Sequence, residues 1–305
     1  MTFAAEFVQL SLVPLLIATL AAICCAIPGN FLVLRKQALI GDAISHVVLP
    51  GIVIAFLITG TINAWPVMLG ATIASIIAAI LIELTRRLGR IEPGAAMGVI
   101  FTTLFAAGVL LLEQTETSGV HLDVEHALYG NLESLIWLSA TGWESLLDRK
   151  ALADLPPQLL RLFIVMITVS GFVVLFWKEL TISTFDEAFA KSLNLPTNTL
   201  GFAIVVIVAI TAVAAFDAVG SIIVIAMFIC PPASARLMTN QLHIQVLWSI
   251  VFAILSAILG YILAGYAPLW LGFEHAVSAA GMIATISGII LGITCLFGPK
   301  RKRSV

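Results

Sequence analysis

Long apolar runs constrain the fold of this chain more than any other feature of its sequence. Nine runs are long enough to cross about 30 Å of hydrocarbon as α-helix. They lie near residues 10–34, 38–60, 65–85, 95–112, 158–177, 200–216, 219–238, 244–266 and 276–297. We therefore predict an all-α integral membrane protein, a polytopic helical bundle with about nine spans and a range of about 8–10.

The region 200–238 is the least regular part of this pattern. Asp217 and the nearby Gly220 are its only interruption. A broken or re-entrant element is an alternative to two full spans there, because irregular backbone is tolerated at membrane depth when protein buries it.

The overall composition is that of a membrane protein. Hydrophobic residues make up 61% of the chain, charged residues only 10%, and the mean hydropathy is +1.12. A soluble domain of this size needs a polar surface that this chain does not have. We find no internal repeat and no separate soluble domain, and predict that residues 1–305 form a single transmembrane domain.

The basic residues predict the orientation of the chain. With the N-terminus outside and the C-terminus in the cytoplasm, 12 of the 15 Lys and Arg residues lie on the cytoplasmic side, as the positive-inside rule requires. They are Arg35, Lys36, Arg86, Arg87, Arg90, Lys178, Lys191, Arg236, Lys300, Arg301, Lys302 and Arg303, the last four in a basic tail over about 298–305.

The segment of about 113–157 is then an external loop rich in acidic residues. Such a loop raises the local cation concentration or attracts a basic partner, but a plain solvated loop would look the same. The stretch HLDVEH within it contains His121, Asp123, Glu125 and His126, which is either a first binding site for metal or an ordinary acidic loop.

The stretch GDAISHVVLPG, residues 41–51, carries two ionisable side chains inside an apolar run. Asp42 and His46 are four residues apart and so lie on the same face of a helix. Ionisable groups at membrane depth are costly and mark candidate ion or substrate paths, although a simple Asp–His hydrogen bond between helices is the alternative. Asp217 is a second candidate path residue, or else a buried polar contact.

Pro50 and Gly51 predict a break in the helix just after this pair. Proline cannot donate the backbone hydrogen bond to the carbonyl of His46, so an additional oxygen should be freed there. Carboxylate, imidazole and carbonyl suit Zn, Mn or Fe, and are poor ligands for Cu(I). Two side chains are an incomplete shell, which suits transport and suggests that a second subunit supplies the remainder.

The sequence has no GxxxxGK[ST] nucleotide loop, so active transport would need either an ion gradient or a separate ATPase. The cytoplasmic segment of about 178–199 contains FDEAFAKSLNLP, which predicts a short amphipathic helix. Asp186 and Glu187 lie in its first turn, Asn194 is placed for a left-handed C-cap, and Pro196 ends it. Such a helix is either a docking element for a motor subunit or an ordinary connector.

Together these motifs resemble the manganese/zinc/iron permease family of ABC importers. GDAISHVVLPG matches the family's G-D-A-[IL]-S-H-x-x-L-P-G run, and FDEAFAKSLNLP is similar to its cytoplasmic coupling loop. Residues 214–236 are similar to its late paired spans and 275–300 to its C-terminal helix. The resemblance extends over about 10–300. The one departure is Asn194, where the family has Gly; Asn is the next-best residue for a positive φ.

The resemblance implies a type II ABC importer-like permease subunit in a bacterial cytoplasmic membrane. It implies three partners: a second permease subunit, a cytoplasmic ATP-binding subunit and an extracytoplasmic metal-binding protein. It also implies that Asp42 and His46 contact the transported Mn, Zn or Fe, with no permanently bound cofactor. The coupling contacts to the ATPase would involve Asp186, Glu187, Ala188 and Asn194.

Three other functions remain open at this point. A gradient-driven secondary metal transporter would also lack a nucleotide loop, and an ABC permease could instead carry a metal chelate. A membrane zinc peptidase is the least compatible, because the sequence has no HExxH. The small acid–imidazole pair favours bare metal over a bulky chelate.

Overall fold

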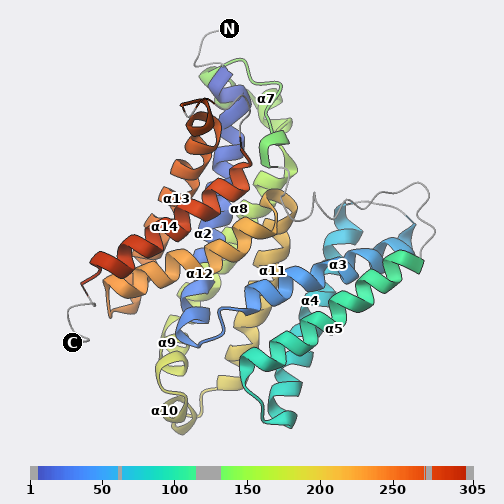
Figure 1. The fold of residues 1–305 in the computed structure, drawn as a ribbon, viewed down its shortest axis with the longest axis vertical. Helices are drawn as coiled ribbons and strands as arrows, with labels where there is room; N and C mark the ends of the chain where they lie inside the picture. Colours follow the sequence, from blue (N-terminus) through green and yellow to red (C-terminus); the bar gives the residue numbers. More distant parts are fainter. Residues whose placement is uncertain (1–5, 61–63, 115–131, 271, 273–276, 300–305) are drawn as a thin grey trace. The chain divides into compact units, whose positions relative to one another are not determined.

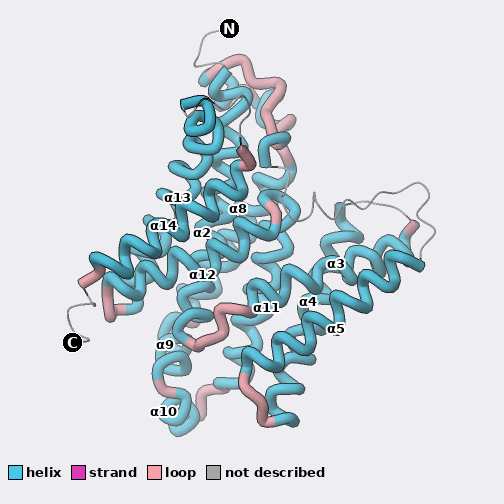
Figure 2. Tube along the Cα trace, in the orientation of Figure 1, coloured by secondary structure: helices cyan, strands magenta, loops and turns pink. Residues whose placement is uncertain are grey.

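The structure is a computed structural model that describes residues 6–60, 64–114, 132–270, 272 and 277–299. Among these residues, nine helices are long and apolar enough to span a membrane. The spans are Val8–Leu34, Ile40–Thr59, Trp65–Arg86, Gly94–Leu111, Pro157–Leu175, Thr197–Val219, Ser221–Met238, Leu242–Pro268 and Ala279–Phe297. Every long element that Figure 2 colours is helical, which confirms the predicted all-α class and the count of nine.

The irregular region 200–238 consists of two helices separated by one residue. α11 (Thr197–Val219) ends directly before Gly220, and α12 (Ser221–Met238) begins directly after it. Gly220 has a φ of +78°, which side-chain-bearing residues rarely adopt. Two separate spans, rather than one re-entrant element, therefore account for this region by length and composition.

The chain divides into two compact units, which are described separately below. One comprises Pro28–Val124 and Gly171–Val213, and the other comprises Met1–Ile27, Glu125–Ser170 and Ala214–Val305.

In the first unit, α3 (Ile40–Thr59) packs against both α4 (Ala64–Gly89) and α5 (Pro93–Gln114), as Figure 1 shows. Small residues let the backbones approach closely, as is usual between membrane helices. A Cβ added at Gly51 would lie 2.6 Å from the carbonyl oxygen of Gly70, and one added at Gly108 would lie 2.8 Å from Cβ of Pro50.

These contacts correct the predicted helix break at Pro50 and Gly51. α3 runs without interruption from Ile40 to Thr59 and contains Pro50 in its interior. Both residues are buried and closely packed, Pro50 against α5 and Gly51 against α4. The proline still cannot donate to the His46 carbonyl, but the helix does not open there.

The first unit also contains two short helices between the spans α8 (Pro157–Leu175) and α11. α9 (Trp177–Phe185) packs against α10 (Glu187–Ser192), and the ring of Trp177 meets Phe31 edge-on with the ring centres 6.4 Å apart. Phe31 belongs to α2 (Val13–Leu34), which follows a π-helical turn, η1 (Val8–Leu12). The sequence predicted α10, but not α9 as a separate helix.

In the second unit, α12, α13 (Leu242–Trp270) and α14 (Ala279–Phe297) pack against one another. The short elements η2 (Leu132–Ser134), η3 (Trp143–Leu147) and α7 (Arg149–Ala153) precede α8. Oε1 of Glu133 accepts a 2.7 Å hydrogen bond from the backbone N–H of Ala279. A carboxylate from a distant segment therefore satisfies one of the free donors at the start of α14.

Candidate functional site

Asp42 and His46 lie on the same face of α3, as their spacing predicted. Nε2 of His46 is 3.6 Å from Oδ1 of Asp42, close for an ion pair but long for a hydrogen bond. Ser45 lies on the same side of the helix, and its hydroxyl donates a 2.6 Å hydrogen bond to the backbone oxygen of Asp42. The carboxylate and the imidazole therefore keep lone pairs available for a ligand.

The exposure along α3 shows where this pair points. The side chains of Asp42 and His46 are 33% and 35% exposed, while Ala43, Ile44 and Val47 are almost completely buried. Ser45 and Leu49 are also partly exposed, at the helical spacing that continues the stripe. Among the described residues, the pair therefore lies at the edge of its unit rather than inside it.

Two aromatic rings of α5 hold the imidazole of His46. Phe101 stacks on it with the ring centres 5.2 Å apart and the planes 21° apart. Phe105 meets it edge-on with the ring centres 5.6 Å apart. The sequence analysis did not single out these rings, because the pairing of α3 with α5 depends on the tertiary fold.

In the second unit, Asp217 forms an ion pair with Arg161. Nη1 of Arg161, in α8, donates to Oδ2 of Asp217 over 2.8 Å, and the two side chains are 18% and 35% exposed. Asp217 therefore makes a polar contact, although it is partly exposed rather than buried, and its role in an ion path stays a prediction. Arg161 was missed, although a lone arginine at the start of an apolar run was a visible signal.

α10 has the C-cap that the sequence predicted, but its N-terminus differs from the prediction. Asp186 is its N-cap residue rather than part of its first turn, and its carboxylate accepts a 2.9 Å hydrogen bond from the backbone N–H of Phe189. Asn194 has a φ of +56°. The hydrogen bonds from the N–H of Leu195 to the oxygen of Ala190 and from that of Asn194 to Lys191 form a Schellman C-cap.

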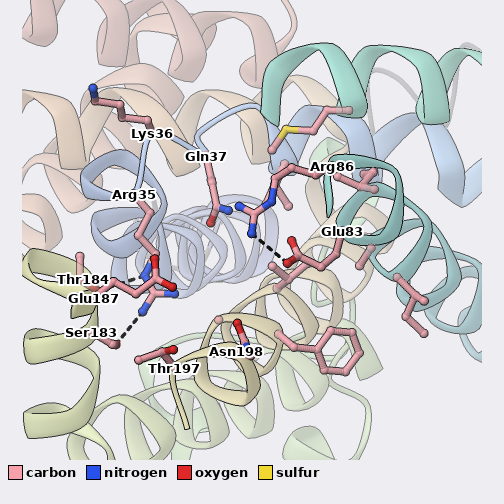
Figure 3. Close-up of a pocket in the computed structure, with 18 of the residues that line it drawn as sticks. Arg35, Lys36, Gln37, Glu83, Arg86, Ser183, Thr184, Glu187, Thr197 and Asn198 are labelled. Atoms are coloured by element: carbon pink, nitrogen blue, oxygen red, sulfur yellow. Dashed lines mark hydrogen bonds and ion pairs between the residues drawn. The ribbon is translucent and has the colours of Figure 1, made fainter. Parts of the chain in front are cut away.

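A cavity of about 710 Å³ lies beside α10 in the first unit. Its polar lining comes from the α2–α3 link, the end of α4, the α9–α10 segment and the start of α11 (Figure 3). Arg86 forms a 2.8 Å ion pair with Glu83 at its wall, and Arg35 donates to Ser183 and Thr184 on another side.

Glu187 is exposed on α10 and also lines this cavity. Its carboxylate is 2.6 Å from Nζ of Lys191. The hydrogen bond from Lys191 lowers the pKa of Glu187, partial burial raises it, and the positive charges of Lys191, Arg86 and Arg35 lower it further. Burial lowers the pKa of Arg35, an effect that the charge of Glu187 opposes.

Two predicted features lie outside the described residues. They are the cluster His121, Asp123, Glu125 and His126, and the basic residues Lys300 to Arg303. Elsewhere in the described part of the chain, no group of three or more His, Cys, Asp or Glu side chains is placed to hold a metal ion.

In the part of the chain that the structure describes, nine apolar helices, a polar pair on one span and a capped helix between two others define a polytopic helical membrane protein. The chain belongs to the ABC 3 transport family, whose model matches residues 7–137 and 151–297. It is thus the membrane component of an ABC transport system and not the ATPase.

Three proteins illustrate the relationship. The chain is 37% identical over 280 residues to the manganese transport system membrane protein MntD of Bacillus subtilis, covering 92% of this chain and 89% of MntD. It is 34% identical over 287 residues to the zinc transport system membrane protein TroD of Treponema pallidum, covering 93% and 73%. Its fold is similar to that in PsaBC from Streptococcus pneumoniae in complex with Fab, with a TM-score of 0.73 at 26% identity, covering 95% and 92% of the two chains.

Proposed function

We propose that this chain is the permease subunit of an ATP-driven importer of a divalent transition metal, Mn, Zn or Fe. In this proposal residues 1–305 act as one transmembrane permease domain in a bacterial cytoplasmic membrane, with the N-terminus outside and the C-terminus in the cytoplasm. The observation that carries it is the Asp42–His46 pair, a carboxylate and an imidazole on the exposed stripe of an otherwise apolar span. These donors suit such metals, and the relatives named above serve manganese and zinc transport systems.

The same pair supports a two-subunit path. Asp42 and His46 supply two ligands, whereas structural zinc sites have four. Their exposed position at the edge of the unit leaves room for ligands from a second permease subunit, either a copy of this chain or a related one. A shell that is completed across two subunits can open when they move apart, and this lets the ion leave.

α10 supports a contact with a cytoplasmic ATP-binding subunit. Phe189 on α10 and Leu193, its C-cap residue, are each about half exposed, and so is Phe185 at the end of α9. Asp186, Glu187 and Ala188 lie exposed beside them. A short, firmly capped helix with exposed apolar side chains on and beside it is the kind of element that docks into a groove on a partner. An extracytoplasmic metal-binding protein would deliver the metal on the opposite side.

The test is uptake of radioactive manganese, zinc or iron by proteoliposomes that contain the complex of this chain with its second permease and ATP-binding subunits. We expect ATP-dependent uptake that Asp42→Asn and His46→Gln each abolish. Ser45→Ala is the matched control on the same stripe, because its hydroxyl bonds only to the helix backbone in the described structure.

Three results would contradict the proposal. Unchanged uptake in both variants would exclude Asp42 and His46 from the metal path. Uptake by this chain without any ATPase would favour a gradient-driven transporter. Uptake of a metal chelate but not of free metal would favour a chelate permease.

A further inference from the structure

Arg35 joins two segments that are far apart in sequence. It lies in the link between α2 and α3, seven residues before Asp42. Its Nε donates to Oγ1 of Thr184 over 3.1 Å, and its Nη2 donates to Oγ of Ser183 over 2.9 Å. The rigid guanidinium fork thus holds two adjacent hydroxyls at the end of α9, directly before α10 (Figure 3).

The guanidinium of Arg35 lies in close contact with its surroundings. Gly201, on α11, lies so close that an added Cβ would be 3.3 Å from Nη1 of Arg35. Ser183 is 9% exposed, and Leu180 one turn earlier is completely buried. Lys36, the next residue, is exposed. A cationic residue that only obeys the positive-inside rule would be solvated like Lys36.

The link from Arg35 to α3 is short and stiff. The N–H of Gln37 donates to the oxygen of Leu32, and that of Lys36 donates to Val33, which is the Schellman pattern with Lys36 at a φ of +57°. The N–H of Ile40 then donates to the oxygen of Gln37 as α3 begins. Nearly all of the backbone between Arg35 and Asp42 is therefore in a helix or in a hydrogen-bonded turn.

We infer that Arg35 is a positioning residue that fastens the α9–α10 segment to the start of α3, so that displacement of α10 moves Asp42 and His46. This inference rests on the proposed function for its role in transport, but the fastening itself is a property of this chain alone. Both hydroxyls are needed for a firm attachment, because a single hydrogen bond to the guanidinium would allow the segment to rotate about it.

The first experiment measures the fastening without any partner. Hydrogen–deuterium exchange is followed on this chain in lipid nanodiscs for wild type, Arg35→Gln and the double variant Ser183→Ala, Thr184→Val. We expect the backbone amides of 183–194 to exchange roughly tenfold faster in both variants, from the loss of two hydrogen bonds. Lys36→Asn is the control, because it removes the neighbouring charge and Asn tolerates a positive φ.

The second experiment measures coupling in the reconstituted complex as metal transported per ATP hydrolysed. We expect Arg35→Gln to keep the ATPase activity but to lower this ratio severalfold, while Lys36→Asn keeps the wild-type ratio.

The outcomes separate this inference from the proposed function. Unchanged exchange in 183–194, or a wild-type ratio in Arg35→Gln, overturns the inference. A parallel loss of ATPase activity and transport at an unchanged ratio also overturns it, since this indicates failed assembly. If the wild-type complex shows no ATP-dependent metal uptake, the proposed function fails, and the exchange experiment still decides whether Arg35 fastens the segment.

Discussion

The crossing of α3 and α4 at Gly51 makes a sharp prediction, because the two backbones meet there without a side chain between them. Gly51→Ala would place a Cβ 2.6 Å from the carbonyl oxygen of Gly70, 2.8 Å from Cα of Ala71 and 2.8 Å from Cβ of Ala74. The first two of these atoms belong to the backbone and cannot rotate away. We expect the helices to move apart and the protein to be destabilised.

Two opposing effects determine the change in the free energy of unfolding for Gly51→Ala. Overpacking a close contact costs about 1–3 kcal/mol, and a contact with backbone belongs near the upper end of this range. Alanine in place of glycine inside a helix stabilises the helix by about 0.5–1 kcal/mol. The net loss is about 2 kcal/mol in the free energy of unfolding, or roughly thirtyfold in the folding equilibrium.

The assay is unfolding of the purified chain in detergent by added denaturant, followed by loss of helical signal. Gly98→Ala in α5 is the matched control, because among the described residues a Cβ at that position would meet open space beyond the backbone of its own helix. It should unfold at the same concentration as wild type or slightly above it. Equal stability of Gly51→Ala, Gly98→Ala and wild type would refute the argument that α3 and α4 cross in direct backbone contact.

Three further predictions concern polar contacts. Asp186→Ala should destabilise α10 by about 1 kcal/mol through loss of its N-cap, seen as faster amide exchange there, whereas Asp186→Ser should retain protection. Arg161→Gln and Asp217→Asn should show a coupling energy of about 1–2 kcal/mol in a double-mutant cycle of unfolding; additive effects would exclude the ion pair. The hydrogen bond from Lys191 lowers the pKa of Glu187 below its ordinary value of 4.5. The ionised Glu187 therefore stabilises α10 fully above that pH, and this stabilisation is lost as the pH falls below it. Amide exchange in α10, corrected for the intrinsic rate, should thus increase at acid pH in wild type and depend less on pH in Glu187→Gln.

Local patterns predicted much of this fold correctly. The nine spans follow from apolar length, and the interruption at Gly220 was visible as the only break in its region. The C-cap of α10 follows from a residue type that acts within one turn, so Asn194 was predicted in its place, whereas Asp186 was expected in the first turn and is the N-cap residue. The shared face of Asp42 and His46 follows from helical periodicity alone.

Features that depend on pairing between helices could not be predicted in this way. Pro50 looked like a helix breaker, but its ring fits against Gly108 in another helix, and α3 remains continuous. The partners Arg161 of Asp217 and Glu133 of α14 are more than 50 residues away in sequence. A single sequence contains both members of such a pair but not the fact that they meet.

The two rings of α5 change the entropy of any binding event at His46. Phe101 and Phe105 pack against the imidazole and limit its rotation, so a ligand has less to immobilise. Ordering a side chain on binding costs about 0.5–1.5 kcal/mol, which is roughly a two- to tenfold change in affinity. Neither phenyl ring can donate a lone pair to a cation. Substitution of either ring should nevertheless lower the affinity of His46 for a ligand that the ring does not contact.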